Sequence, residues 1–171
     1  MFRLLNAGFR IIALALLAII ALAIEYPWWT AGTLIVLYFL GRHLQAQEAR
    51  RRLTLDPLTL SPIEYENYCA DLLRQAGWKV WTTPRQDQGV DVVAVLRGVR
   101  IALQAKRWNQ RVGNRSVQEI VAGRRHYACT VAVVVSPSGY TRSARELAVS
   151  NGVILLHHNH LANLEKIARI P

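Results

Sequence analysis

The sequence predicts an α/β fold with a mixed sheet, preceded by two apolar helices. After residue 60, short strand-like runs and helical patterns alternate along the chain, whereas residues 1–41 hold two runs almost free of polar side chains. A meander of strands followed by crossover helices implies a mixed sheet with helices on both faces. The length of 171 residues leaves room for one ordinary domain and an appendage.

The apolar runs predict a membrane hairpin over residues 1–41. Residues 11–24 contain no polar side chain, and residues 28–40 are nearly as apolar. Each run is shorter than the roughly 20 residues of a membrane-crossing helix, but both can extend at their ends. We expect transmembrane helices at about 4–25 and 27–41. Two alternatives stay open, a hairpin that enters one leaflet only and a cleaved signal peptide.

Charges beside the apolar runs predict the orientation. Arginines precede the first run and follow the second, and the turn between them carries only Glu25. Positive charge stays on the cytoplasmic side. We therefore expect a multi-pass protein of the inner (cytoplasmic) membrane, with both termini and the following domain in the cytoplasm and with membrane lipid as a partner.

The rest of the chain divides into a basic connector and a basic domain. Residues 42–60 are arginine-rich and end in a proline-containing linker, so we place the domain at 61–171. The whole chain carries a formal net charge of +10. Such a balance favours nucleic acid or an anionic surface as partner. The two cysteines are too few for a disulfide framework or a four-thiolate zinc site.

Capping signals and hydrophobic periodicity predict the elements of the domain. Ser61 and Glu64 form a capping-box pattern that opens a helix, and Ser116 and Glu119 form a second one. Strands are expected at 78–82, 90–96, 99–106, 130–136 and 153–157, and the later helices at 116–127, 141–150 and 161–170. The histidines at 157, 158 and 160 predict a surface turn, since side chains at a strand end alternate faces.

Polar residues on the predicted hairpin carry the chemistry. A tight turn at residues 97–98 pairs the start of one strand with the end of the next, which brings Asp91 beside Gln104 and Lys106. A purely structural ion pair is one interpretation, because buried charges need partners. A required lysine is the other. Only three of the 21 basic residues are lysines, and lysine offers a compact charge with an adjustable pKa.

An ordered set of segments points to a known family. The set comprises Tyr65-Glu66, Gly77–Val80, Asp87–Asp91, Gln104-Ala105-Lys106, Val117-Gln118-Glu119, Ser136–Thr141, Ala144 with Ala148, and Asn151-Gly152-Val153. Together these segments resemble the Mrr-like (type IV restriction) branch of the PD-(D/E)xK endonucleases, over about residues 61–161. The resemblance implies an αβββαβ restriction-endonuclease-like core and magnesium-dependent cleavage of DNA.

The resemblance also implies roles for individual residues. Asp91 matches the metal-binding carboxylate, Gln104 stands where most relatives have a second acid, and Lys106 matches the lysine that acts on the attacking water and the phosphate. Glu66 matches the helix glutamate. The implied metal ligands are Asp91, the Ala105 carbonyl and Glu66, a set of hard oxygen donors that suits Mg²⁺ or Mn²⁺.

The sequence thus predicts a membrane-anchored, Mg²⁺-dependent endodeoxyribonuclease that hydrolyses phosphodiester bonds in restriction or DNA defence. DNA is expected to contact Arg107, Arg111 and Arg115, because phosphates attract clustered basic side chains. The resemblance places the helix of Gln118 near the site and so adds Gln118 as an auxiliary DNA-contacting residue. The alternative is a membrane-tethered nucleic-acid-binding module with the nuclease fold and no cleavage. A homodimer is left open.

Overall fold

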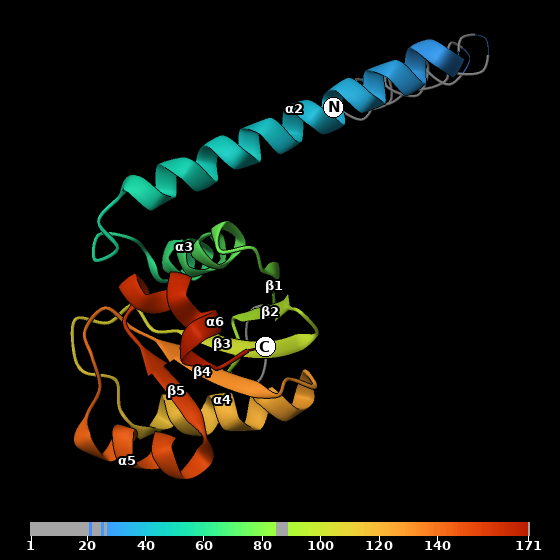
Figure 1. Cartoon of the computed structure of the whole chain (residues 1–171). Helices are drawn as coiled ribbons and strands as arrows, with labels where there is room; N and C mark the ends of the chain where they lie inside the picture. The colour runs from blue at the N-terminus through green and yellow to red at the C-terminus, as the bar shows by residue number, and fades with distance from the viewer. Residues whose placement is uncertain (1–20, 22–24, 26, 85–88, 171) are drawn as a thin grey trace, which may run out of the picture. The chain divides into compact units, whose positions relative to one another are not determined.

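The computed structural model describes residues 27–84 and 89–170, together with Ala21 and Glu25 (Figure 1). The chain divides into two compact units, with the division between Glu48 and Ala49. The predicted domain limits at residues 41 and 60 stay a prediction. Asp87 and Gln88 of the family-like segments lie outside the described residues.

The elements follow the predicted order. They are α2 (Pro27–Thr54), α3 (Pro62–Gln75), β1 (Lys79–Thr82), β2 (Val92–Leu96), β3 (Val99–Ala105), α4 (Asn114–His126), β4 (Val131–Val135), α5 (Arg142–Asn151), β5 (Val153–Leu156), the 3₁₀ helix η1 (His158–Asn163) and α6 (Leu164–Ile167). The five strands form one sheet in the order β1-β2-β3-β4-β5. β1, β2 and β3 pair antiparallel, and β3, β4 and β5 pair parallel, so the predicted mixed sheet is confirmed.

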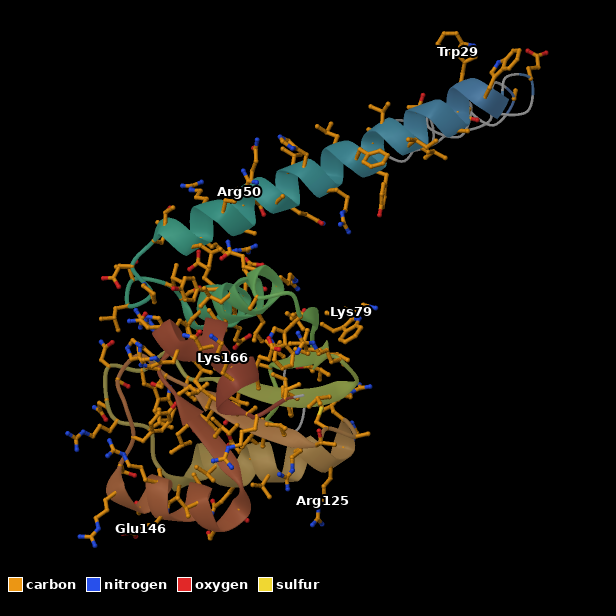
Figure 2. The ribbon with its side chains drawn as sticks, in the orientation of Figure 1. Trp29, Arg50, Lys79, Arg125, Glu146 and Lys166 are labelled. Carbon is orange, nitrogen blue, oxygen red and sulfur yellow. The ribbon has the colours of Figure 1, made fainter. Side chains whose placement is uncertain are left out.

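Helices cover both faces of the sheet. α3, η1 and α6 lie on one face, and α4 and α5 lie on the other (Figure 1). Because side chains of a strand alternate between faces, Leu103 packs on the α3 side with Leu73, and Ala102 packs on the α4 side with Ile120. Arg125 and Glu146 point outward from α4 and α5 (Figure 2), which leaves the inner sides of both helices to the core.

Only one of the two predicted capping boxes forms. The Ser61 N–H donates to Glu64 Oε2 at 2.8 Å, and the Glu64 N–H donates to Ser61 Oγ at 3.3 Å. α4, in contrast, has Gly113 as N-cap residue without a side-chain cap, and Ser116 is buried inside the helix. The predicted box at Ser116 and Glu119 is therefore wrong, and Glu119 is available for other contacts.

The C-terminal segment also differs from the prediction. In place of one helix over 161–170, the chain forms η1 and the short helix α6. His158 is only 7% exposed, so the predicted surface turn is wrong for this residue. Its ring lies edge-on to Tyr65 and Tyr68. Burial, with the neighbouring His157, lowers the pKa of His158 to about 4 against the opposing effect of Asp56.

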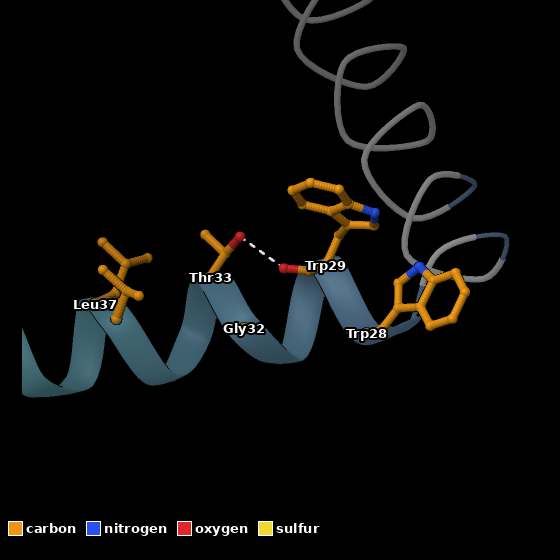
Figure 3. Close-up of a pocket in the computed structure, with 6 residues that line it drawn as sticks. Trp28, Trp29, Gly32, Thr33 and Leu37 are labelled. Carbon is orange, nitrogen blue, oxygen red and sulfur yellow. Dashed lines mark hydrogen bonds between the residues drawn. The ribbon is translucent and has the colours of Figure 1, made fainter.

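α2 is one continuous helix across the predicted limit at residue 41. Its N-terminal half exposes large apolar side chains, and Figure 3 shows Trp28, Trp29 and Leu37 around Gly32 on one side. The hydroxyl of Thr33 donates to the Trp29 carbonyl at 2.7 Å. The helix then continues through the arginine-rich connector to Thr54.

The predicted membrane location is not upheld. Among the described residues, no helix combines the length and the apolar character that a membrane crossing requires. The apolar part of α2 ends at Leu40, well short of roughly 20 residues, and charged side chains follow on the same helix. This finding contradicts the multi-pass inner-membrane location with cytoplasmic termini, and it gives the predicted lipid partner no support. The first predicted helix, at 4–25, falls outside the described part of the chain apart from Ala21 and Glu25.

The last turn of α2, which belongs to the second unit, is joined to α3 by an ion pair with the buried carboxylate of Asp71. Arg52 Nε lies 3.1 Å from Asp71 Oδ2, and Arg74 Nη1 lies 2.7 Å from Asp71 Oδ1. The side chain of Asp71 is 4% exposed, so its charge depends on both arginines. The connector thereby gains a fixed end point on the domain.

Candidate active site

β2 and β3 separate at Asp91, next to the site predicted from the sequence. The Asp91 N–H donates to the Leu103 carbonyl at 2.9 Å, but the Ala105 N–H donates to the side chain of Asp91, at 2.7 Å from Oδ2. The carboxylate thus replaces a backbone carbonyl of the ladder. Val90, just before it, packs into the α4-side core like Val93, which breaks the strict alternation of the strand. The hydroxyl of Thr83 holds this break by donating to the Val90 carbonyl.

Gln104 is buried and only half satisfied. The residue is 1% exposed, and its Nε2 donates to Glu119 Oε2 at 2.9 Å. Its Oε1 is buried and has no hydrogen-bond partner among the described residues. A buried acceptor without a partner costs about 1–3 kcal/mol, so such an atom in a native site calls for a ligand.

Lys106 shares the face of Gln104, two residues further along the strand direction. Its Nζ lies 3.6 Å from Glu119 Oε2, and its side chain is 24% exposed. The Lys106 N–H donates to the Val135 carbonyl at 2.8 Å, which fixes the end of β3 to β4. The ammonium of Lys106 therefore lies at the partly exposed edge of the site, and the backbone of the residue is held by β4.

Glu119 connects the polar residues of the site. Besides Gln104 and Lys106 it contacts Arg115, whose Nε donates to Glu119 Oε1 at 2.8 Å. Burial raises the pKa of Glu119, but the hydrogen bonds from Arg115 and Gln104 outweigh it and hold the pKa below its ordinary value. Gly89 packs directly on this residue, because a Cβ at position 89 would lie 2.6 Å from the Glu119 Cβ.

Asp91 has the opposite electrostatic balance. Burial raises its pKa above the ordinary value, and the Ala105 N–H and Lys106 only partly oppose this, while Glu119 raises the pKa further. A carboxylate that is buried beside a second carboxylate gains from any additional positive charge. The site therefore favours a cation near Asp91.

Glu66 lies on α3, and its predicted role as a ligand stays a prediction. The pKa of the Cys69 thiol, one turn further along α3, is affected by the carboxylates of Asp91 and Glu66. Burial raises the pKa of Cys69, a hydrogen bond from Tyr65 opposes this, and the charges of Asp91 and Glu66 raise it further. Both carboxylates are therefore within electrostatic reach of one buried atom.

The predicted DNA-contacting residues fall into two groups. Arg107, Arg111 and Arg115 follow Lys106 through the loop into α4, and Arg107 Nη2 donates to the Leu58 carbonyl at 2.5 Å. Gln118, in contrast, is exposed and lines a groove between α4 and α5 with Leu147 and Asn151. Among the described residues, no hydrogen bond or ion pair joins it to Asp91, Gln104 or Lys106.

Sequence reasoning missed the role of Glu119 because it assigned the residue to a helix cap. One available signal was its spacing from Arg115, since charges of opposite sign four residues apart face each other on a helix. The contacts with Gln104 and Lys106 depend on tertiary structure, and no local pattern predicts them.

The fold and the site together define a restriction-endonuclease-like α/β domain: a mixed five-stranded sheet with an acid, an amide and a lysine where two antiparallel strands separate. The chain belongs to the restriction endonuclease family Mrr_cat, whose profile matches residues 57–164. This family implies a phosphodiester hydrolase and is typically metal-dependent.

Solved structures share parts of this fold. The protein of unknown function AF1548 is 18% identical with a TM-score of 0.50, and the match covers 57% of this chain and 58% of that one. VC1899 from Vibrio cholerae is 13% identical with a TM-score of 0.44 and coverage of 62% and 32%. The MspJI restriction endonuclease, solved with a 27-mer oligonucleotide, is 20% identical with a TM-score of 0.39 and coverage of 75% and 30%. The chain thus spans less than two thirds of each of these proteins, and no curated protein sequence matches it.

The residues at the site fit a hard divalent cation. Within residues 27–84 and 89–170, no three His, Cys, Asp or Glu side chains are arranged to hold a metal. Oxygen donors of other kinds are present, however. The unpartnered Oε1 of Gln104 lies on the residue beside Ala105, whose N–H binds Asp91. Carboxylate, amide and backbone carbonyl oxygens are the ligands that Mg²⁺ and Mn²⁺ accept.

Proposed function

We propose that the chain is a metal-dependent endodeoxyribonuclease that cleaves phosphodiester bonds within DNA as part of restriction or DNA defence. The observation that carries the proposal is the convergence of Asp91, Gln104 and Lys106 at the end of β3, with one buried oxygen of Gln104 unpartnered. Membership in a restriction endonuclease family supports the same reaction. Residues 61–171 are the proposed nuclease domain.

Asp91, Gln104 Oε1, the Ala105 carbonyl and Glu66 are the groups that would hold Mg²⁺ or Mn²⁺. A bound cation of this kind polarises the phosphate and lowers the pKa of water. The raised pKa of Asp91 fits this role, because burial makes the negative carboxylate costly until positive charge arrives. Gln104 adds an oxygen without adding a second charge on the strand.

Lys106 is proposed to act on the substrate. Its ammonium would donate hydrogen bonds to a phosphate oxygen and orient the attacking water, which stabilises the negative charge that develops on the phosphate. The 3.6 Å contact with Glu119 keeps the ammonium beside Gln104 while leaving part of the group exposed to a substrate.

The loop after Lys106 is the proposed DNA-binding segment. Arg111 and Arg115 are exposed, and a pocket of about 280 Å³ is lined by Arg107, Trp108, Asn109 and Gln110. Arginine side chains near the active residues would hold the phosphate backbone in register. Arg107 contributes less freely than the others, since one of its nitrogens is bound to Leu58.

The test is cleavage of plasmid DNA by the full chain with Mg²⁺, Mn²⁺ or EDTA. We expect metal-dependent nicking that falls by about a hundredfold or more in Asp91→Ala and Lys106→Ala. Glu146→Ala and Lys166→Ala are matched controls of the same charge change. Both control residues are exposed and lie on α5 and α6 (Figure 2), and both variants should cleave like the parent.

Two outcomes would count against the proposal. Cleavage that survives both Asp91→Ala and Lys106→Ala would mean that these residues are not the active site. Salt-sensitive DNA binding without cleavage under any metal would instead support a nucleic-acid-binding module that retains the nuclease fold.

A further inference from the structure

We propose that Glu119 is a positioning residue that supplies, from α4, the negative charge that strand residue Gln104 lacks, and that orients the Gln104 amide toward the metal. The inference rests on the proposed function and deepens it. It comes from three contacts of one side chain, with Gln104, Lys106 and Gly89.

Glu119 sets the orientation of the Gln104 amide. A carboxylate without a proton only accepts hydrogen bonds, so the group of Gln104 that lies 2.9 Å from Glu119 Oε2 must be the NH₂. The carbonyl oxygen Oε1 is then directed away from Glu119, where it stays buried and unpartnered within the described residues. Without Glu119, a half-turn of the amide would exchange NH₂ and oxygen and present hydrogens to a cation.

Glu119 also places a negative charge next to Gln104. Glu119 Oε2 is the atom shared by Gln104 and Lys106, whereas Oε1 binds Arg115. The Glu119 carboxylate thus contacts both the NH₂ group of Gln104 and the ammonium of Lys106. Asp91 and Glu119 together balance Lys106 and Arg115, so that a site with a neutral residue at position 104 still carries two acidic groups.

The position of Glu119 on α4 is also in close contact with the backbone at Gly89. Gly89 lies two residues before Asp91 and has a φ of +73°, and an added Cβ would be 2.6 Å from the Glu119 Cβ and 3.1 Å from its carbonyl carbon. The backbone that leads to Asp91 therefore packs directly on the helix position that holds Glu119. Glu119 therefore contacts both the segment that leads to Asp91, through Gly89, and Gln104 on β3.

The experiment measures Mn²⁺ binding to the full chain without DNA, from the electron paramagnetic resonance signal of free Mn²⁺. We expect Glu119→Leu to raise the Kd for Mn²⁺ by about ten- to a hundredfold, the usual effect of losing a group that orients a metal ligand. Glu119→Gln should raise the Kd by a smaller factor, because its amide oxygen still accepts from Gln104. Glu146→Leu, which removes an exposed carboxylate paired with Arg142, is the control and should leave the Kd unchanged.

The double variant Gln104→Glu/Glu119→Gln distinguishes positioning from simple loss of structure. It exchanges acid and amide, so the NH₂ at position 119 donates to a carboxylate at position 104 and the hydrogen bond is restored in reverse. We expect its Kd for Mn²⁺ to return to within about threefold of the parent value, with a matching partial recovery of cleavage.

The outcomes separate this inference from the proposed function. One outcome is that the parent chain binds Mn²⁺ and cleaves DNA, and that the folded variants Glu119→Leu and Glu119→Gln bind Mn²⁺ with the same Kd as the parent. This outcome overturns the role of Glu119 and leaves the proposed nuclease activity standing. Failure of the double variant to recover binding, with its circular dichroism unchanged, overturns the role as well. A parent chain that neither binds Mn²⁺ nor cleaves DNA overturns both.

Discussion

The two faces of the sheet share strands β2 and β3, and both bury an apolar core, but near the end of β3 they bury different kinds of residue. On the α3 face, Leu103 meets Leu73 and Tyr65 in a core of large apolar side chains. On the α4 face, the next residue along the same strand, Gln104, meets the charged Glu119. Successive residues of β3 thus have different tasks, since Leu103 packs in the core on one face and Gln104 makes polar contacts on the other.

This difference indicates how the fold supports the candidate site. The polar residues lie where β2 and β3 separate, and the opposite side of β3 is held by a close-packed core. A change in the apolar core of the α3 face should therefore lower stability while leaving the activity of folded molecules intact. A change in the polar pair of the α4 face, Gln104 and Glu119, should alter activity more than stability.

Leu73→Ala should disrupt the packing of the apolar core on the α3 face and give the largest effect on stability. Leu73 is fully buried, so the loss of contacts and the cavity left behind should lower the free energy of unfolding by about 2–5 kcal/mol. Urea unfolding measures the change, with Val149→Ala, at a position 84% exposed, as the control. A loss below about 1 kcal/mol would show that this core does not dominate stability.

Gly89→Ala tests the contact between the Asp91 segment and α4. The left-handed conformation costs a residue with a Cβ about 1–2 kcal/mol. The clash with Glu119 adds to this, and it should also displace Asp91 and reduce cleavage. Gly98→Ala is a close control, since its φ is +82° and an added Cβ meets nothing within 4 Å.

The difference between these two variants isolates the contact from the backbone strain. Gly98→Ala should lose stability and keep its rate of DNA cleavage, whereas Gly89→Ala should lose both. Equal rates of cleavage in the two variants would show that the packing of Gly89 on Glu119 is not needed at the site.

His158 brings a pH dependence to the α3 face. Its pKa is about 4 in the folded chain and near 6.5 when unfolded, so between these values the unfolded chain binds a proton that the folded chain does not. Stability from this residue is complete above pH 6.5 and should fall by about 2 kcal/mol from pH 7 to pH 5. His158→Gln should remove that part of the loss, and His160→Gln, on the exposed side of η1, should keep it.

Much of the fold could be predicted from local sequence patterns. The turn at residues 97–98 predicted the pairing of β2 with β3, which the register of Val92 with Leu103 confirms. The box at Ser61 predicted the start of α3 because its hydrogen bonds involve residues three apart. Such features depend on neighbours in sequence, and this is why the order of the elements was predicted correctly.

What the sequence did not predict depends on distant contacts. His158 is buried by Tyr65, which lies 93 residues away along the chain, so the local pattern suggested only a turn. Ser116 has the spacing of a cap, but the helix begins earlier and buries it. α2 continues past residue 41 because the connector holds good helix formers such as Ala, Gln, Glu and Arg. The apolar composition before it therefore did not mark the end of the helix.

Arg111 and Arg115 give the smallest expected effect and test which part of the α4 side faces DNA. Arg111 is exposed, and no ion pair involving it is found among the described residues, whereas Arg115 is held by Glu119. Because each phosphate contact releases counterions, Arg111→Gln should reduce the slope of log K against log salt by about 1. Arg115→Gln should reduce it less, since its guanidinium already neutralises a carboxylate, and Arg142→Gln on α5 should leave it unchanged. Equal slopes for Arg111→Gln and the parent would place the DNA contact away from this loop, and the proposed separation of packing from chemistry would then rest on Asp91, Gln104 and Lys106 alone.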